Sequence, residues 1–255
     1  PPSMGEGMTT TAVLKLSGEA FAGHDPMNGT VFESVSEQIL RLVQDGHSLG
    51  VVVGGGNILR GTRPWGARGM PAAQLHRLGM LATQLNAEAL TYQLQRFGVD
   101  VDLIARASVG AVGARTWTSP MPPPRNSQVY VVAGGTGKPG VSTDVAALEL
   151  AHDLDCRVVV MSKFGVSAIY DGDPRRRPVS SPEPTRLDSI SAREVLERGL
   201  AFMDRSAVEL SDRYSIVVRV IGANEPRDIY RLIGEGENIG STMFPSVAGL
   251  RHAVA

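Results

Sequence analysis

The sequence has only one cysteine, Cys156, among its 255 residues. A single cysteine excludes an internal disulfide, and this favours a protein of the reducing cytoplasm. Cys156 stands directly before the run 157–161, whose last four residues are apolar. We therefore expect a buried structural thiol at this position and not a nucleophile.

Long apolar runs and an excess of charge of either sign are missing as well. No apolar run approaches the roughly 20 residues that a membrane-spanning helix needs. Residues 1–11 lack the charged and apolar regions of a signal peptide. The 25 Lys and Arg residues against 26 Asp and Glu residues give a formal net charge of −1. We expect neither a membrane nor a nucleic-acid partner, so any phosphate must be bound by individually placed groups.

Three common signatures are also absent. The sequence contains no Gly-x-x-x-x-Gly-Lys-Ser/Thr segment of a P-loop and no protein-kinase motif set. The five histidines are scattered without the spacing of metal ligands. The sequence therefore predicts no metal ion held by protein side chains alone.

What is present is an alternation of short apolar strands with helical patterns. Runs such as Val51–Val53 and Val158–Val160 are apolar throughout, as expected for parallel strands covered on both faces. The predicted strands cover residues 13–16, 49–53, 99–104, 129–133, 157–161 and 216–221. The predicted helices cover residues 35–43, 72–97, 145–150, 192–198, 204–211 and 225–233. This alternation predicts an α/β sandwich with a mainly parallel central sheet.

The pattern changes after residue 150, where turns and a charged, proline-rich loop at Arg175–Pro184 follow. We expect one continuous domain of two lobes, residues 9–150 and residues 151–245. Residues 1–8 and 246–255 are expected to be flexible ends.

The segment Gly134–Asp144 is the most informative part of the chain. It reads GGTGKPGVSTD and connects a predicted strand to a predicted helix. Its four glycines let backbone N–H groups approach an anion. Ser142 and Thr143 offer an N-cap and hydroxyl donors, and Asp144 falls at the helix start, where the dipole stabilises its charge. The segment therefore predicts a phosphate site.

Two further loops follow predicted strands, Ser17–Gly18 and Gly54–Asn57. Lys15 ends the first predicted strand, and Lys163 ends the fifth. Because the carboxyl ends of parallel strands meet at one edge of a sheet, we expect these groups to converge with Gly134–Asp144 on one crevice.

Two lysines, two glycine-rich loops and one aspartate are the groups that transfer between phosphates requires. The cations cancel repulsion between donor and acceptor and stabilise charge on the transferring group. An acceptor that is already a phosphate needs no strong general base. We therefore expect Asp144 to position the lysines and not to remove a proton.

Several blocks of the sequence resemble bacterial UMP kinases, which are members of the amino acid kinase superfamily. In chain order they are KLSGEA at 15–20, GGGNILRG at 54–61, GMLAT at 79–83, GTG at 135–137, YDGDP at 170–174, EVLERGL at 194–200 and FMD at 202–204. The similarity runs from about Val13 to Phe244. It implies a three-layer αβα sandwich and a homohexamer.

The resemblance also implies roles for individual residues, with an acceptor-binding N-terminal lobe and an ATP-binding C-terminal lobe. Lys15, Asp144 and Lys163 would be catalytic. The ATP-binding residues would be Lys15, Ser17, Gly18, Gly56, Arg60, Ser162, Tyr170 and Asp173. The acceptor-binding residues would be Gly55, Arg60, Thr136, Gly137, Lys138 and Thr143. Mg²⁺ would be held mainly by the nucleotide phosphates and water, with no protein ligand.

Departures from the family pattern concentrate on the acceptor side. His76 stands where the family usually has an aspartate that binds the acceptor ribose. The loop Thr136–Val141 lacks the family's amide and two aromatic residues, and its Lys138 would favour a more anionic acceptor. Thr91 occupies the position of an arginine linked to GTP activation in some members. The segment after Lys163 is longer and lacks an aspartate.

Three functions are compatible with these observations. The first is ATP-dependent phosphoryl transfer onto a nucleoside monophosphate, by default UMP to UDP. The second is a kinase for a modified nucleotide or for another phosphorylated or phosphonylated metabolite. The third is a non-catalytic paralogue that binds a nucleotide or an anion, although such a binder would not need Lys15, Asp144 and Lys163 together.

Overall fold

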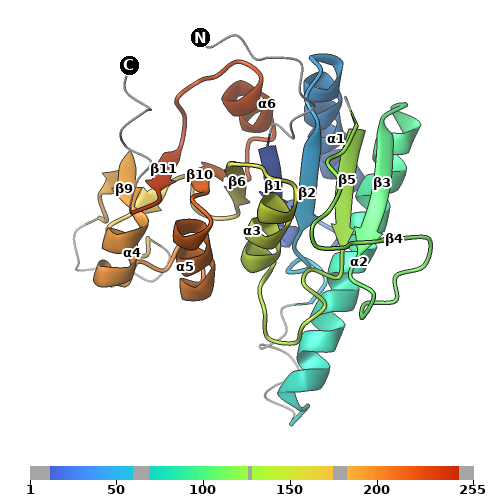
Figure 1. The fold of residues 1–255 in the computed structure, drawn as a ribbon, viewed down its shortest axis with the longest axis horizontal. Helices are drawn as coiled ribbons and strands as arrows, with labels where there is room; N and C mark the ends of the chain where they lie inside the picture. The colour runs from blue at the N-terminus through green and yellow to red at the C-terminus, as the bar shows by residue number, and fades with distance from the viewer. Residues whose placement is uncertain (1–11, 60–68, 126–127, 175–182, 247–255) are drawn as a thin grey trace.

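A computed structural model describes residues 12–59, 69–125, 128–174 and 183–246. The strands of its main sheet are β1 (Ala12–Leu16), β2 (Leu49–Val53), β3 (Asp100–Ala105), β4 (Arg115–Thr116), β5 (Gln128–Ala133), β6 (Val158–Lys163), β9 (Ser189–Ser191), β10 (Val217–Gly222) and β11 (Ser241–Phe244). They lie in the order β4-β3-β5-β2-β1-β6-β10-β11-β9 (Figure 1). A separate pair is formed by β7 (Ile169–Tyr170) and β8 (Arg186–Leu187).

The main sheet is parallel at each described pairing except one. β10 and β11 run antiparallel, whereas β11 pairs parallel with β9. The prediction of a mainly parallel α/β sheet is therefore confirmed. β1 lies in the interior of the sheet, between β2 and β6.

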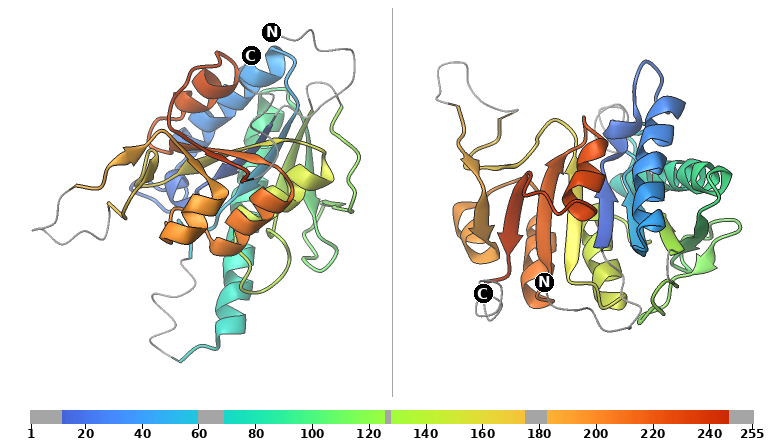
Figure 2. Two further views of the ribbon diagram at one scale, coloured as in Figure 1. Left: turned by 60° about the vertical axis from the view of Figure 1, so that its left-hand side comes forward. Right: turned by 90° about the horizontal axis from the view of Figure 1, so that it is seen from above.

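Helices cover both faces of the sheet. They are α1 (Gly29–Gln44), α2 (Ala72–Arg96), α3 (Thr143–Asp153), α4 (Ala192–Arg198), α5 (Arg205–Arg213) and α6 (Arg227–Ile233), with a 3₁₀ turn η1 (Gly18–Phe21). One core cluster contains residues of α1, α2 and α6, and the other contains residues of α3, α4 and α5. Figure 2 shows the resulting three layers. None of the described helices is long and apolar enough to cross a membrane.

Alternate residues of each central strand point to opposite faces of the sheet and so contribute to both cores. In β1, Val13 packs into the core under α3, whereas Leu14 and Leu16 pack into the core under α1 and α2. In β2, Val52 faces the α3 side and its two valine neighbours face the other side. Apolar runs without alternation are therefore required, because each strand buries both of its faces.

The predicted helices and strands are present, and several short elements were missed. β4, β7, β8, β9 and β11 contain only two to four residues each. Such segments are too short to show a hydrophobic period, and their pairing depends on neighbouring strands. Cys156 is buried, and burial raises the pKa of its thiol, as expected for a structural cysteine.

The two-lobe division near residue 150 stays a prediction. A single sheet runs through both halves of the chain, and α3 packs against β1 and β2 as well as against α5. Most of the loop Arg175–Pro184, and the expected flexible ends apart from Ser246, lie outside the described residues.

The carboxyl ends of β1 and β2 bring two of the expected loops into backbone contact. The amide of Gly54 donates to the carbonyl of Leu16 at 2.8 Å. A Cβ added to Gly18 would lie 2.6 Å from the carbonyl carbon of Gly54 and 2.6 Å from the amide nitrogen of Gly56. Glycine is required at position 18 because backbone atoms, which cannot rotate aside, fill the space of a side chain.

This contact predicts the effect of Gly18→Ala. The methyl group would force the two loops apart, and we expect the free energy of unfolding to fall by about 1–3 kcal/mol. Gly29→Ala is the matched control, because nothing lies within 4 Å of a Cβ at that exposed position. Urea denaturation should show a change of less than about 0.5 kcal/mol for the control. Equal stability of the two variants would contradict the close contact.

Candidate active site

Lys15, Asp144 and Lys163 form a buried charge cluster at the carboxyl edge of the sheet. Lys15 Nζ lies 2.9 Å from Asp144 Oδ1, and Lys163 Nζ lies 2.6 Å from Asp144 Oδ2. The three side chains are 8–12% exposed. The sequence predicted that these residues share one crevice, and in the structure the two lysines contact Asp144 directly.

Strand parity and helix capping explain this convergence. Val13 and Met161 face the core under α3, and Lys15 and Lys163 stand two residues further along the same strands, so they point to the same side. α3 begins there, with the Ser142 side chain accepting from the Val145 amide. Asp144 in the first turn therefore meets both ammonium groups.

The electrostatics of the cluster keep Asp144 ionised. Burial alone raises the pKa of the carboxyl, but the charges of Lys15 and Lys163 outweigh burial and hold the pKa well below its usual range. Burial lowers the pKa of Lys163, and the like charge of Lys15 adds to this effect against the attraction of Asp144. Two lysines share one carboxylate, so the cluster favours an additional anion.

The glycine-rich loops are held in place by α2, a role that the sequence reasoning missed. Asn86 donates to the carbonyl of Gly54 at 2.7 Å and exchanges hydrogen bonds with the Asn57 amide at 2.7 and 3.0 Å. Thr83 accepts from the amide of Gly134 at 3.1 Å. The sequence did contain a signal for this role: Thr83 and Asn86 are polar residues three positions apart, so they lie on the same face of a predicted helix.

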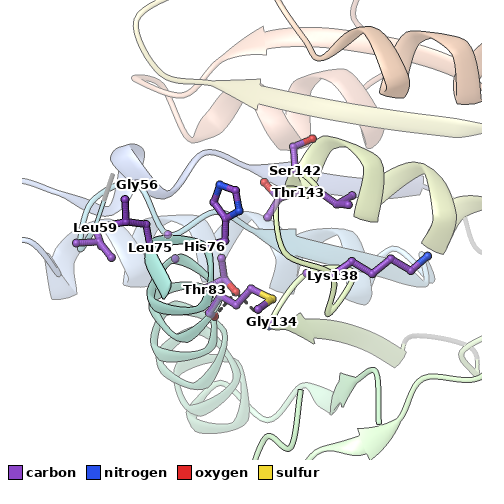
Figure 3. A pocket seen from close by; sticks show the side chains of 15 residues that line it. Gly56, Leu59, Leu75, His76, Thr83, Gly134, Lys138, Ser142 and Thr143 are labelled. Carbon is purple, nitrogen blue, oxygen red and sulfur yellow. Dashed lines mark hydrogen bonds between the residues drawn. The ribbon is translucent and has the colours of Figure 1, made fainter. Parts of the chain in front are cut away.

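A cavity of about 390 Å³ lies between the two glycine-rich loops and α2. Gly55 and Gly56 line it from the loop after β2, and Thr143 lines it from the start of α3. His76 extends into the same region from α2 (Figure 3). Both glycine-rich loops line this cavity, so they face one crevice, as the sequence predicted.

Two further cavities lie on the other side of the charge cluster. One of about 500 Å³ is lined by Asp144 and Lys163 together with α4, α5 and the segment between them. The other, of about 240 Å³, is lined by Tyr170 and Asp173. Residues 199–202 line both cavities, so the two are contiguous.

Other predicted site residues lie next to these cavities but do not line them. Thr136 and Gly137 face the segment 106–109, because a Cβ at Gly137 would lie 2.5 Å from the Ser108 hydroxyl. Ser162 is buried in β6, where its carbonyl accepts from the Ser17 amide at 3.1 Å. The predicted residue Arg60 lies outside the described residues.

Lys138 borders the cavity of about 390 Å³, but its side chain runs away from His76 (Figure 3). It also lines a polar hollow behind the loop, near Arg106. Arg106 is itself paired with Glu149 at 3.2 Å and with Asp153 at 3.3 Å. These contacts join the segment behind the glycine loop to α3.

Comparison with known proteins identifies the family. The model of the amino acid kinase family matches residues 10–222. The chain belongs to the amino acid kinase family. The uridylate kinase of Streptomyces avermitilis is 33% identical over 90% of this chain and 90% of its own length. That of Yersinia enterocolitica is 31% identical over 93% and 94%.

The fold agrees with this membership. The crystal structure of UMP kinase from Bacillus anthracis matches with a TM-score of 0.80 and 22% identity, over 92% of this chain and 96% of that one. The three-layer arrangement expected from the sequence is therefore that of the amino acid kinase fold. Within the described part of this family member, no group of three or more potential metal-ligating side chains occurs.

The shared carboxylate predicts the stability of an Asp144→Asn variant. Removing the charge leaves two buried lysines without a counter-ion, and we expect the free energy of unfolding at pH 7 to fall by about 3–5 kcal/mol. Asp188→Asn is the control, since its carboxylate is 85% exposed, and exposed pairs contribute at most about 1 kcal/mol. Chemical denaturation of both variants measures the difference.

The pH dependence of this difference has a defined sign. Because the folded pKa of Asp144 lies below its unfolded value, its stabilisation is complete above the ordinary carboxyl range. The difference between wild type and Asp144→Asn should shrink as the pH falls through the depressed pKa. A difference that grows on acidification would contradict the assignment.

Proposed function

We propose that this protein is an ATP-dependent kinase that phosphorylates a nucleoside monophosphate, with UMP to UDP as the default reaction. The uridylate kinase relatives support a nucleotide kinase. The observation that carries the proposal is the position of the charge cluster between two sets of cavities. Thr143 lines the cavity on one side, and the next residue, Asp144, lines the cavity on the other.

The acceptor would bind in the cavity of about 390 Å³, and ATP in the contiguous cavities of about 500 and 240 Å³. Small-molecule sites commonly have volumes in this range. Tyr170 and Asp173 would contact the base and ribose of ATP, and the apolar side chains of Leu200 and Phe202 would cover the base. Gly55 and Thr143 would contact the acceptor.

The reaction needs charge neutralisation more than proton transfer. An oxygen of the acceptor phosphate forms a bond to the γ-phosphorus, and the bond from that phosphorus to the β,γ-bridging oxygen breaks, releasing ADP. Lys15 and Lys163 neutralise the anionic oxygens on the two sides. Asp144 stays ionised and holds both ammonium groups in position. Mg²⁺ bound to the nucleotide phosphates would add to this neutralisation.

Two other features belong to the proposal. Leu81, Leu85 and Tyr92 on α2 are 46%, 53% and 64% exposed and follow the spacing of one helix face. An exposed apolar face of this kind supports the homo-oligomer, a hexamer by resemblance, that we propose for this chain. A cytoplasmic location is proposed on the same resemblance.

A second candidate acceptor is a modified nucleotide or another phosphorylated metabolite. The observation that favours it is the absence of carboxylates among the described residues that line the acceptor cavity. A non-catalytic binder is disfavoured, because binding alone does not require two buried lysines that share one carboxylate.

A coupled assay of ADP release tests the proposal directly. With ATP and Mg²⁺, we expect turnover with a panel of nucleoside monophosphates that includes UMP, CMP and AMP, and none with uridine, which lacks the accepting phosphate. Turnover with a phosphorylated metabolite alone would select the second candidate. Tight nucleotide binding without turnover of any acceptor would overturn the kinase assignment.

Variants of the charge cluster test the residue roles. Asp144→Asn should lower kcat by at least about 100-fold, because the two misplaced cations no longer stabilise the transition state, while ATP still binds.

The lowered pKa of Lys163 predicts a pH dependence of kcat. As the pH rises, kcat should fall at a pH below the usual pKa of a lysine, because Lys163 loses its charge there. In Lys163→Arg this fall in kcat should move to higher pH, because guanidinium stays charged. A fall at an unchanged pH would assign it to another group.

A further inference from the structure

The acceptor cavity has an unusual chemical composition among its described lining residues. It contains no aspartate, glutamate, asparagine, glutamine, phenylalanine, tyrosine or tryptophan. Leu59, Leu75, Met80 and Val141 supply an apolar part. The described side chains therefore offer no carboxylate that could accept two hydrogen bonds from the hydroxyl pair of a ribose, and the His76 imidazole is the one ring among them.

Few of the remaining polar side chains are free to bind a ligand. The Thr83 hydroxyl donates to the Met80 carbonyl at 2.7 Å and accepts from the Gly134 amide at 3.1 Å. Ser142 accepts from the Val145 amide as the N-cap of α3. The side chain of Lys138 leads away from the cavity (Figure 3).

Two described side chains that line the cavity have no such partner, the Thr143 hydroxyl at the start of α3 and the His76 imidazole. Of the two, only His76 can carry a positive charge. Its half-buried imidazole lies between the glycine loop after β2 and the start of α3, which line the same cavity (Figure 3). None of the described residues forms a hydrogen bond or ion pair with the ring. Gly140 packs beside it, since a Cβ there would lie 3.3 Å from His76 Cε1. Glycine at this position leaves the ring accessible.

The surrounding charges favour an anion next to the ring. Two carboxylates adjoin the cavity walls: Glu19, which accepts from the neutral Ser17 hydroxyl and lies beside Gly56, and Asp144, whose charge is outweighed by two lysines. The first turn of α3 adds a positive dipole end. An imidazole donor in such surroundings binds an anionic oxygen better than a hydroxyl group.

We infer that His76 is a specificity-determining residue that selects a phosphorylated acceptor carrying a second anionic group, a carboxylate or a phosphate, over plain UMP. The inference rests on the proposed function, since it concerns the acceptor of the same site. One phosphate lies at the charge cluster, where transfer occurs. The second anionic group accepts a hydrogen bond from the imidazole.

The test compares three acceptors that share a uridine 5′-phosphate framework. UMP has one anionic group, orotidine 5′-monophosphate adds a carboxylate on the base, and uridine 3′,5′-bisphosphate adds a phosphate on the sugar. Kd from calorimetry and kcat/KM from the coupled assay are measured for each. We expect at least one doubly anionic acceptor to bind about ten-fold or more tightly than UMP. Comparison of orotidine 5′-monophosphate with uridine 3′,5′-bisphosphate shows whether the preferred second anionic group is on the base or on the sugar.

Variants at position 76 assign the preference to the imidazole. His76→Asp should reverse it, because a carboxylate repels the second anion and accepts from ribose hydroxyls. His76→Gln retains a donor and should keep part of the preference. Arg77→Gln is the control, since Arg77 is an exposed neighbour outside the cavity lining, and it should leave the ratio unchanged. Melting temperatures confirm that each variant is folded.

The outcomes separate this inference from the proposed function. Tighter binding of UMP than of both other acceptors, or an unchanged ratio in His76→Asp, overturns the role of His76 even if the enzyme phosphorylates UMP. A preference for the doubly anionic acceptor that is lost in His76→Asp supports it. Binding is decisive in both cases, so an absence of turnover would count against the kinase assignment alone.

Discussion

The site depends on one carboxylate shared by two ammonium groups. Burying Lys15 and Lys163 side by side would be unfavourable without a counter-ion, and Asp144 supplies it at 2.9 and 2.6 Å. The compensation is incomplete, because two positive charges face one negative charge. This excess of buried positive charge is already arranged in the unliganded protein, so little reorganisation would be needed to bind an anion.

The backbone cradles around this cluster depend on α2 and α3. α2 holds one glycine loop through Asn86 and the other through Thr83. α3 carries Asp144 in its first turn and, further along, Glu149 and Asp153, which hold Arg106 behind the second loop. Glycine residues allow the backbone conformations of the two loops, and the hydrogen bonds and ion pairs from α2 and α3 fix one of these conformations.

Much of this arrangement could be predicted from the sequence, for identifiable reasons. Uninterrupted valine runs predicted a sheet covered on both faces, and strand ends followed by Lys15, Gly54 and Gly134 predicted one crevice. Strand parity would also have placed Lys163 on the same face as Lys15. The direction of the Lys138 side chain could not be predicted, because it depends on how the loop Gly134–Val141 folds. β9 and β11 were missed because their pairing is decided by tertiary contacts.

Two consecutive residues, Thr143 and Asp144, line cavities on opposite sides of the charge cluster. The walls on its two sides come from different parts of the chain: α2 and the glycine loops on one side, and residues of 163–174 and 195–208 with Asp144 on the other. A change at position 76 can therefore alter one wall while the opposite wall keeps its shape. If one side binds the acceptor and the other the nucleotide donor, as proposed, such a division lets descendants of one ancestral enzyme diverge in the molecules that they modify without rebuilding the donor site.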